Sequence, residues 1–490
     1  MYSVKIVHFN DVFVKILTEK SIERELYDHF SFMADGFKFH PKFRAKIWDG
    51  RIHLYSLRNK TIYRGLVSEI IQFCEERGYD VDYLGENIDE KITIEDLENF
   101  FQEFKLKVTP RDYQKQAIFD SIKYGRRVIL SPTASGKSLI IYSILRILGV
   151  KTLLIVPRIN LVTQMYTDFQ DYSVDDDEWD VEEKCSKIMA GAAKENLNEI
   201  VISTWQSIHN LKKDWYDRQE FGLVIVDEVH GAKANSLKKV MENLSNTKYR
   251  IGLTGTLDDI QVHEWTIKGL FGDVSSVVET HELIKKGTIA KLKIDCLFLK
   301  YKKETCAHVC ALGDYHKEME FITAHERRNK LIVNLALSTK GNTLVLYNYV
   351  DKHGKILQEL FDKYCKGKLV FFIHGKIKDE EREEIRQKVE KSENGCIILA
   401  SYGTYSTGVN IVNLHNIILA HPIKGKIRLL QSIGRGLRKN ENKESCNLYD
   451  IADDFRYKKK KNYTYFFMIE RLRIYVKARF PYKIREIGIE

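Results

Sequence analysis

The sequence lacks the long apolar run that a membrane-spanning helix needs. No segment of its 490 residues reaches the roughly 18 uninterrupted apolar residues of a transmembrane helix. The first residues, 1–5 (MYSVK), do not lead into the hydrophobic core of a signal peptide. These absences argue against an integral membrane protein, and we expect a soluble cytoplasmic protein with no membrane partner.

Clustered cysteines are missing as well. The eight cysteines are scattered, and the one close pair, Cys306 and Cys310, has no second pair at the spacing of a zinc site. We therefore expect buried free thiols. The length of the chain leaves room for about three domains of about 150 residues each, with enough apolar residues to build their cores.

Positive charge is unevenly distributed. The formal net charge is +10, and residues 456–490 hold 11 Lys and Arg against three Glu. This excess favours a polyanion as partner. A lysine run such as residues 458–461 fits a solvated loop equally well, so composition leaves both interpretations of this basic C-terminal tail open.

The chain is organised around residues 128–138, VILSPTASGKS, which predict a strand, a phosphate loop and the start of a helix. In such a loop the backbone curls until N–H groups and the helix N-terminus face a polyphosphate. Lys137 would neutralise the β- and γ-phosphates, and the Ser138 hydroxyl would hold Mg²⁺. Ser131 stands where the pattern has its first Gly, so a chance Gly-Lys-Ser in a surface turn is the competing interpretation.

Two further motifs flank this loop at the spacing of an ATP site. Residues 223–228 (LVIVDE) predict a strand that ends in two carboxylates. Asp227 can hold Mg²⁺ through water, and Glu228 can orient or deprotonate the attacking water. Upstream, Gln114 can read the adenine edge while Arg111 or a neighbouring Tyr packs on the base. A helix that starts with Pro explains residues 109–110 without any ligand.

Buried-strand patterns alternate with helical ones along most of the chain. Strands are predicted at 152–157, 199–204 and 251–256, and again at 343–347, 369–373 and 396–400, with helices at 353–364 and 379–390 in the second set. Such alternation predicts parallel sheets covered by helices. We expect one α/β domain at residues 111–280 and another at 281–455.

Residues 1–90 predict a small α+β module. Apolar residues alternate with polar ones at residues 37–40, which favours a strand. Residues 48–55 combine an Asp-Gly turn signal with another alternating run, and the apolar residues of 66–77 have helical spacing. Aromatic and cationic residues interleave here, which suits phosphate contact combined with base stacking. The competing interpretation places each aromatic in the module's own core. Residues 87–104 are acidic and helical in pattern, which predicts a linker or a bridging helix, and residues 91–110 are expected to link the module to the next domain.

The set of motifs resembles superfamily 2 helicases of the DExH branch. The resemblance rests on residues 110–114 (PRDYQ), 132–138 (PTASGKS), 204–206 (TWQ), 227–230 (DEVH) and 253–256 (LTGT), in that order. In the second domain it continues with His374-Gly375 and Arg382, residues 401–410 (SYGTYSTGVN) and residues 431–438 (QSIGRGLR). The resemblance implies two RecA-like motor domains, with ATP and Mg²⁺ as cofactors.

The resemblance also implies the site residues. Expected catalytic residues are Glu228, Asp227, Lys137, Gln431, Arg435 and Arg438. Expected ATP contacts are Arg111, Gln114, Pro132, Thr133, Ala134, Ser135, Gly136, Lys137, Ser138, Asp227, Gly408 and Asn410, with Ser138 and Asp227 as metal ligands. Expected DNA contacts are Arg158, Thr204, Gln206, His374, Gly375, Ser401, Thr404, Lys42, Arg44, Trp48 and Arg51.

Two of these expectations concern the second domain. Arg435 and Arg438, three residues apart, should share one face of a helix, with Arg438 as the arginine finger and Arg435 as the γ-phosphate clamp. ATP binding would then favour closure of the two domains and hydrolysis would favour opening. Tyr402 stands where many relatives carry Thr, which leaves open whether Ser401 or Thr404 contacts the nucleic-acid backbone.

Over nearly its whole length the chain resembles the UvsW-type helicases of T-even bacteriophages, through residues 30–36, 41–44, 48–51, 400–403, 406–408 and 414–415 and the basic tail. This implies an ATP-dependent DNA helicase, monomeric and in the host cytoplasm, that acts on Holliday junctions, stalled forks and R-loops in recombination, repair and replication. The partner would be branched, single- or double-stranded DNA, with RNA in hybrids. An RNA helicase, a DNA translocase subunit without strand separation, and a binding protein with an inactive ATP site are the alternatives.

Overall fold

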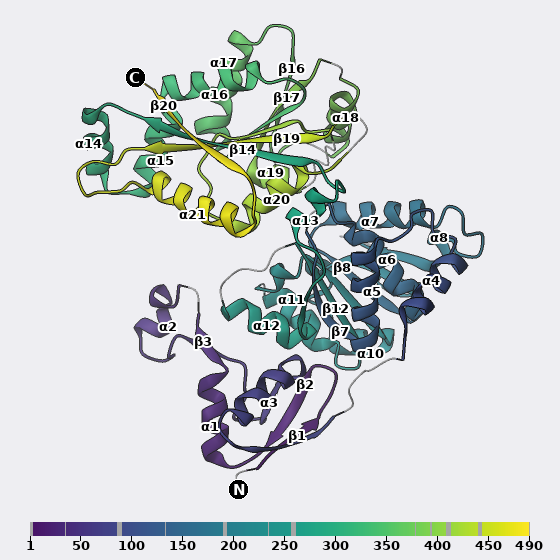
Figure 1. Ribbon diagram of the computed structural model, residues 1–490. Helices are drawn as coiled ribbons and strands as arrows, with labels where there is room; N and C mark the ends of the chain where they lie inside the picture. Colours follow the sequence, from purple (N-terminus) through teal and green to yellow (C-terminus); the bar gives the residue numbers. More distant parts are fainter. Residues whose placement is uncertain are drawn as a thin grey trace. The chain divides into compact units, whose positions relative to one another are not determined.

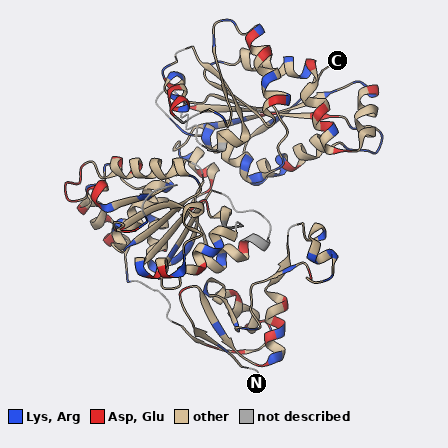
Figure 2. Cartoon of the chain, turned by 180° about the vertical axis from the view of Figure 1, so that it is seen from behind, with Lys and Arg blue, Asp and Glu red and all other residues tan. Residues whose placement is uncertain are grey.

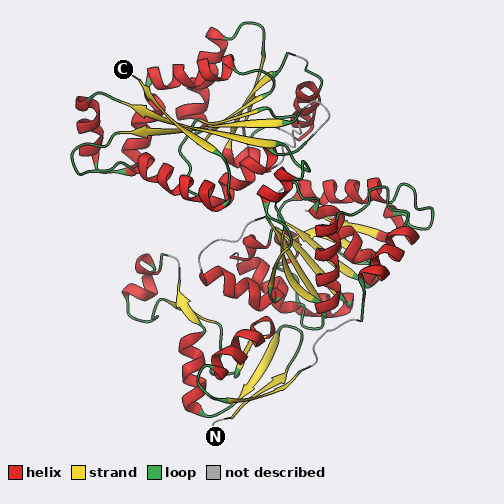
Figure 3. Cartoon of the chain, viewed as in Figure 1, coloured by secondary structure: helices red, strands yellow, loops and turns green. Residues whose placement is uncertain are grey.

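The chain folds into two compact units, one built from most of residues 1–277 and the other from residues 278–490 (Figure 1). This computed structural model describes residues 3–34, 36–85, 91–132, 134–189, 194–233, 235–255, 261–377, 379–392, 394–407, 413–439 and 443–489. Each unit contains a seven-stranded sheet, and Figure 3 shows helices packed around the strands of each sheet. No helix in the described ranges combines the length and apolar character needed to cross a bilayer.

The N-terminal module is an α+β fold, as expected. Its sheet has the order β5-β2-β1-β6, and its helices α1 and α3 span Lys20–His29 and Val67–Glu75. The strands are β1 (Ser3–His8), β2 (Phe13–Leu17), β5 (Thr61–Tyr63) and β6 (Asp80–Leu84). Val4 and Ile6 are fully buried while Lys5 between them is exposed, so the period-2 pattern of the sequence places one face of β1 on the core.

A short arm extends from this module between β3 (Ser31–Met33) and β4 (Arg51–His53), which pair antiparallel. The strand expected at residues 37–40 is wrong, because Phe37–Phe39 is a 3-10 helix and Pro41–Arg44 is helix α2. His40 caps α2 by accepting from the Lys42 amide, and Pro41 starts the helix. The rings of Phe37 and Phe43 pack edge to face at 4.8 Å, so local aromatic packing overrides the alternation.

The first large sheet is parallel in every pairing, with the order β13-β7-β12-β11-β8-β10-β9. The strands span Arg126–Leu130 (β7), Thr152–Val156 (β8), Cys185–Ile188 (β9), Ile200–Thr204 (β10), Leu223–Asp227 (β11), Tyr249–Thr254 (β12) and Val274–Ser276 (β13). Leu153 and Ile155 enter one apolar core and Leu154 and Val156 another. Both faces of β8 are therefore covered, which explains its continuous apolar run.

The helices around this sheet include α5 (Asp112–Tyr124), α6 (Lys137–Leu148) and α7 (Ile159–Tyr172). The expected linker at 91–110 contains a further helix, α4 (Ile94–Glu103), whose first turn is closed by a capping box between Thr93 and Asp96. Leu97 and Phe101 of α4 are buried in the same core as α5. The segment is thus packed on the first large sheet over much of its length.

The second unit repeats the parallel architecture with the order β16-β17-β15-β18-β19-β14-β20. The strands span Lys291–Lys300 (β14), Thr343–Tyr347 (β15), Leu369–Ile373 (β16), Cys396–Ser401 (β17), Asn416–Leu419 (β18), Ser445–Asp454 (β19) and Tyr482–Gly488 (β20). Helices α16 (Glu326–Ser338), α17 (Lys355–Tyr364), α18 (Asp379–Glu390) and α20 (Lys426–Gly436) follow in chain order. The expected pair of RecA-like α/β domains is confirmed.

Residues 456–489 belong to the second unit and end in a strand of its sheet, so they do not form the separate basic tail that the sequence suggested. They contain helix α21 (Tyr463–Lys477) and strand β20, which pairs with β14 from Ile294 to Lys300. Arg471, one of the eleven cations, is buried and donates to Asp450 at 2.8 Å and to the Ile423 carbonyl at 2.8 Å. A charge count cannot distinguish such a structural cation from one that faces solvent.

The N-terminal module is fused to the first large sheet through a shared apolar core and a set of ion pairs. Arg64 of the module donates to Asp11 at 2.8 Å, and Arg126 at the start of β7 lies 3.7 Å from the same carboxylate. Lys268 of helix α12 (Gln261–Phe271) pairs with Glu69 at 2.7 Å. A Cβ at Gly65 would lie only 2.0 Å from the Lys268 carbonyl oxygen, so the two backbones approach closely.

Asp11→Ala tests how strongly this junction supports the first unit. The variant would leave Arg64 and Arg126 in a largely buried site without their shared carboxylate, and we expect the free energy of unfolding to fall by about 3 kcal/mol. The measurement is the denaturant midpoint of the full chain. Asp82→Ala is the control, because its half-exposed pair with Lys5 at 3.8 Å should contribute less than about 1 kcal/mol. Equal effects of the two variants would contradict a stabilising junction.

Candidate nucleotide site and nucleic-acid interface

The phosphate-loop residues connect the carboxyl end of β7 to the N-terminus of α6. Ala134 and Gly136 have positive φ angles of 68° and 78°, which curl the backbone in the manner of an anion-binding loop. A Cβ at position 136 would lie 2.4 Å from the Gln114 amide nitrogen, so glycine is required there. Thr133 lies outside the described residues.

The departure of Ser131 from the glycine pattern has a local explanation. The Ser131 and Ser135 hydroxyl oxygens lie 2.6 Å apart, and both side chains are fully buried. Each hydroxyl therefore gives the other a hydrogen-bond partner, which a buried hydroxyl needs. The loop accommodates a serine where glycine is usual, and the competing surface-turn interpretation does not hold.

Gln114 braces the loop from α5. Its carbonyl oxygen accepts from the Arg111 amide at 2.8 Å, and its amide nitrogen donates to the Ser135 carbonyl at 2.9 Å. The Tyr113 hydroxyl donates to the same carbonyl at 2.9 Å. Gln114 is almost fully buried, and these contacts show a loop-bracing role that sequence reasoning missed. Reading of adenine by Gln114 and Arg111 stays a prediction.

Lys137 lies between the two carboxylates that follow β11. Its ammonium is 2.5 Å from Glu228 Oε1 and 3.7 Å from Asp227 Oδ1. Burial would raise the pKa of Glu228, but the charges and hydrogen bonds of Lys137 and His230 together outweigh this effect and hold the pKa well below its usual range. Burial raises the pKa of Asp227, opposed by Lys137 and increased by the charge of Glu228. Parallel strands whose ends meet at one edge thus bring both motifs together.

Two further polar side chains contact Glu228: His230, which follows β11, and Thr254, the last residue of β12. His230 Nδ1 lies 3.2 Å from Glu228 Oε2 and 3.1 Å from the Thr254 hydroxyl, which itself donates to Glu228 at 3.5 Å. Glu228 has a φ of 55°, a left-handed conformation that is uncommon for a residue with a side chain. These side-chain contacts join the residues that follow β11 to the end of β12. Thr256 lies outside the described residues.

The site suits Mg²⁺ bound together with a nucleotide phosphate. Asp227 would supply one carboxylate to that ion, and the Ser138 hydroxyl, which lies 2.8 Å from the Tyr172 hydroxyl, would supply a second oxygen. Burial raises the pKa of Tyr172 to about 12, so that group stays a neutral hydroxyl near Ser138. The described residues contain no cluster of three or more His, Cys, Asp or Glu that could hold a metal without a nucleotide. Mg²⁺ in nucleotide sites typically takes one or two protein ligands plus phosphate oxygens.

In the second unit, the expected nucleic-acid contacts lie at the carboxyl ends of β16 and β17. The Ser401 and Thr404 hydroxyls are 2.8 Å apart, and Ser401 also accepts from the Thr404 amide at 3.1 Å. Both side chains are buried, and Tyr402 donates to the His421 carbonyl at 2.8 Å. His374 is half-buried and Gly375 exposed just after β16. Gly408 and Asn410 lie outside the described residues.

The two arginines of the last motif do not share a helix. Helix α20 carries Gln431 and Arg435 but ends at Gly436, and Arg438 follows the C-cap residue Leu437. The Arg435 guanidinium lies over the Tyr405 ring, 4.9 Å from its centroid. The expectation that both arginines occupy one helical face is therefore wrong. A Cβ at Gly436 would lie 2.7 Å from Cys446 and from Ile417, so the helix ends where its backbone meets the sheet.

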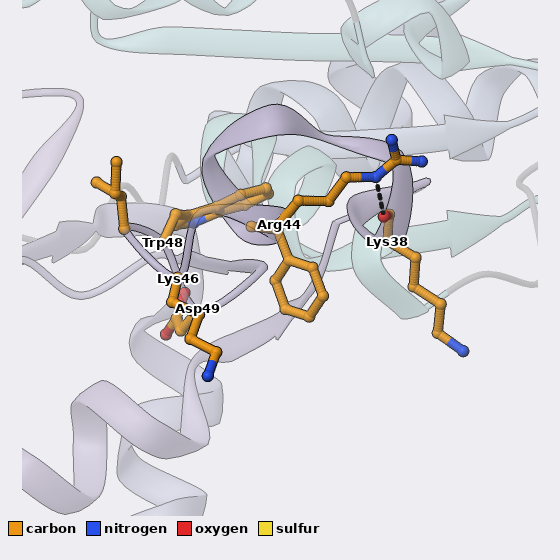
Figure 4. Close-up of a pocket in the computed structure, with 7 residues that line it drawn as sticks. Lys38, Arg44, Lys46, Trp48 and Asp49 are labelled. Carbon is orange, nitrogen blue, oxygen red and sulfur yellow. Dashed lines mark hydrogen bonds between the residues drawn. The ribbon is translucent and has the colours of Figure 1, made fainter.

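The arm of the N-terminal module forms an open cavity of about 540 Å³ (Figure 4). Its lining comprises Lys38, Phe43, Arg44, Lys46, Ile47, Trp48 and Asp49. Arg44 donates to the Lys38 carbonyl at 3.3 Å, and Trp48 donates to the Arg51 carbonyl at 2.8 Å. Figure 2 shows Lys and Arg along this arm, and Lys42, Arg44 and Arg51 are exposed. The cationic and aromatic residues of the N-terminal module that are expected to contact DNA are thus gathered on one arm.

The remaining expected DNA contacts lie at the carboxyl edge of the first large sheet. Arg158 is the N-cap residue of α7, and Gln206 is exposed in helix α9 (Trp205–Ile208). Thr204 is almost fully buried and caps α9 by accepting from the Ser207 amide at 3.3 Å. A contact between Thr204 and DNA stays a prediction, while its capping role is visible.

Comparison with known proteins places these features in a family. The family model described as "DNA helicase UvsW, N-terminal" matches residues 4–83, "Type III restriction enzyme, res subunit" matches 107–259, and "Helicase conserved C-terminal domain" matches 326–440. The ATP-dependent DNA helicase uvsW of Enterobacteria phage T4 is 34% identical, with 99% of both chains covered. A DNA 3'-5' translocase, XPB2, of Sulfurisphaera tokodaii is 27% identical over 70% of this chain and 81% of its own.

Solved structures agree. The crystal structure of T4 UvsW matches over 100% of both chains with 32% identity and a TM-score of 0.52. A DNA-bound restriction-modification enzyme, LlaBIII, shares the fold at 16% identity and a TM-score of 0.57 over 86% of this chain and 34% of its own. Two RecA-like sheets, with a P-loop lysine held against an Asp-Glu pair, define a superfamily 2 helicase. The chain belongs to the UvsW family of ATP-dependent DNA helicases.

Gln114→Ala separates the two roles considered for Gln114. Loss of its hydrogen bonds to the loop should raise KM about 3- to 10-fold for any nucleoside triphosphate, since a net hydrogen bond contributes about 0.5–1.5 kcal/mol. Steady-state kinetics of ATP hydrolysis and of GTP hydrolysis give the KM for each nucleotide. A rise confined to ATP would instead support adenine reading and contradict loop bracing as the main role.

Proposed function

We propose that the chain uses ATP hydrolysis to unwind and translocate on branched DNA, such as Holliday junctions, stalled forks and R-loops, in recombination, repair and replication. The observation that carries this proposal is the arm of the N-terminal module, which gathers cations and aromatic rings, none of which belongs to the nucleotide motifs. A motor that grips backbone phosphates needs no sequence-specific contacts. To recognise a junction, such a motor also needs a further surface that binds unpaired bases and phosphates.

In the proposed reaction Lys137 exchanges its carboxylate partners for the β- and γ-phosphates. Glu228, released from Lys137 and still facing His230, then orients and deprotonates the attacking water. Bound Mg²⁺, held by Ser138 and Asp227, would neutralise phosphate charge. Arg435 and Arg438 supply positive charge to the γ-phosphate, and Gln431 lies one turn before Arg435 on the same helix.

The arm offers surfaces for both stacking and charge neutralisation. Phe39 is 76% exposed and Ile47 is 77% exposed, which is unusual for large apolar side chains that have no binding role. Lys42 and Arg44 on α2 are positioned beside them to neutralise phosphates. A base unpaired at a branch point could stack on such a surface, at a gain of about 1–3 kcal/mol.

Two other activities fit the same motor. An RNA helicase shares every motor motif, and a DNA translocase subunit moves on duplex without separating strands. The translocase deserves a direct test, because XPB2, a relative over 70% of this chain, is described as a DNA 3'-5' translocase. Stimulation of ATP hydrolysis by different nucleic acids, paired with a strand-separation assay, distinguishes all three.

We expect a four-way DNA junction to stimulate ATP hydrolysis by the full chain more strongly than single-stranded DNA or RNA does. Glu228→Gln should lower the stimulated kcat by at least about 100-fold, since general acid–base groups contribute about 10²–10⁴-fold. Its binding to the junction should remain. Stimulation by RNA alone would overturn the proposal, as would hydrolysis on duplex DNA without any strand separation.

Replacing Lys42 and Arg44 by Ala should weaken binding to the junction and flatten its salt dependence. Each lost phosphate contact lowers the slope of log K against log salt by about 0.9. The measurement is junction affinity at several salt concentrations, with the thermal midpoint as a check on folding. Arg58→Ala is the matched control, because Arg58 is an exposed cation in another turn of the same module. An unchanged slope in the double variant would show that the arm does not contact phosphates.

A further inference from the structure

We propose that Lys443 is a positioning residue that holds the backbone of Arg438 in the conformation needed at the γ-phosphate. This inference rests on the proposed role of Arg438 as arginine finger. It extends that role to a residue outside the recognised motif, which ends at Arg438. The basis is a set of contacts around the C-terminal end of α20.

Arg438 has no helix to orient it. Because α20 ends at Gly436, the direction of the Arg438 side chain depends on how residues 437–439 are held. Gly436 packs closely against the sheet, since a methyl group added there would lie 2.7 Å from the side chains of Cys446 and Ile417. The end of the helix is therefore held by packing against the sheet, and residues 437–439 depend on other contacts for their conformation.

Lys443 supplies one of these contacts. Its ammonium donates to the Gly436 carbonyl at 2.6 Å and to the Arg438 carbonyl at 3.1 Å. The side chain is only 1% exposed. One cation thus joins the last helical residue to the arginine two positions later. A lysine at a helix C-terminus is favoured by the partial negative charge of the terminal carbonyls.

Residues 437–439 also form hydrogen bonds with residues 287–290. The Ala290 amide donates to the Leu437 carbonyl at 2.8 Å, and Lys439 donates to the Gly287 carbonyl at 3.1 Å. Among the hydrogen bonds described for this segment, the one from Lys443 to the Arg438 carbonyl acts on the arginine directly. Burial lowers the pKa of Lys443 to about 8, which shows that placing an ammonium here is costly. An apolar side chain of the same length would fill this space without that cost but would leave both carbonyls without this donor.

Lys443→Met tests the inference in the full chain, because methionine retains the length of the side chain and removes the donor. We expect the DNA-stimulated kcat for ATP to fall at least about 10-fold, while KM for ATP changes less than twofold. The key comparison is a double-mutant cycle with Arg438→Ala. If Lys443 acts through Arg438, adding Lys443→Met to Arg438→Ala lowers kcat no further.

Several outcomes would overturn the inference. A wild-type kcat in Lys443→Met, or full additivity with Arg438→Ala, would show that Lys443 does not act through the arginine. A normal kcat in Arg438→Ala would remove the proposed finger role itself, and that result is distinguishable because it needs no change at position 443. The thermal midpoint of each variant is measured alongside. If Lys443→Met unfolds, Lys443→Gln is used, which keeps one amide donor and should give an intermediate kcat with the same non-additivity.

Discussion

The ion pair between Lys137 and Glu228 is the contact on which the nucleotide site depends. It spans two loops that are 91 residues apart in the chain and joins them at 2.5 Å in a largely buried position. A buried ammonium is stable only beside opposite charge, and buried carboxylates need the same compensation. Parallel strands make this possible because the carboxyl ends of β7, β11 and β12 meet at one edge of the sheet. Gln114, His230 and Thr254 then hold the partners of this pair in place.

Fusion of the N-terminal module to the first large sheet changes how its function must be tested. Because Asp11 is shared by Arg64 and Arg126, removal of residues 1–90 would expose an apolar core and leave Arg126 without this carboxylate. Loss of DNA binding after such a deletion would say little about the arm. The arm itself can be altered at exposed residues, since Lys42 and Arg44 have solvent-facing side chains. The junction and the arm therefore call for separate variants.

Periodic apolar patterns predicted the two large sheets well, because strands buried on both faces must be apolar throughout. The strands expected at 343–347, 369–373 and 396–400 correspond to β15, β16 and β17. Prediction was wrong where a short pattern had two physical solutions. Residues 37–40 alternate as a strand would, yet Gly36 in a left-handed conformation and Pro41 at a helix start favour compact turns. Contacts within the arm decided between them.

Residue types and their spacing along the chain were sufficient to predict the family, the order of the motifs and the residues expected at the nucleotide site. Only the tertiary structure decided what distant residues do to one another. In the folded chain α20 ends at Gly436, before Arg438, where its backbone packs closely against Cys446 and Ile417. The tertiary structure also places Lys443 against the Arg438 carbonyl and strand β20 in the second sheet. No local pattern encodes these outcomes, because each depends on packing between segments that become neighbours only in the folded chain.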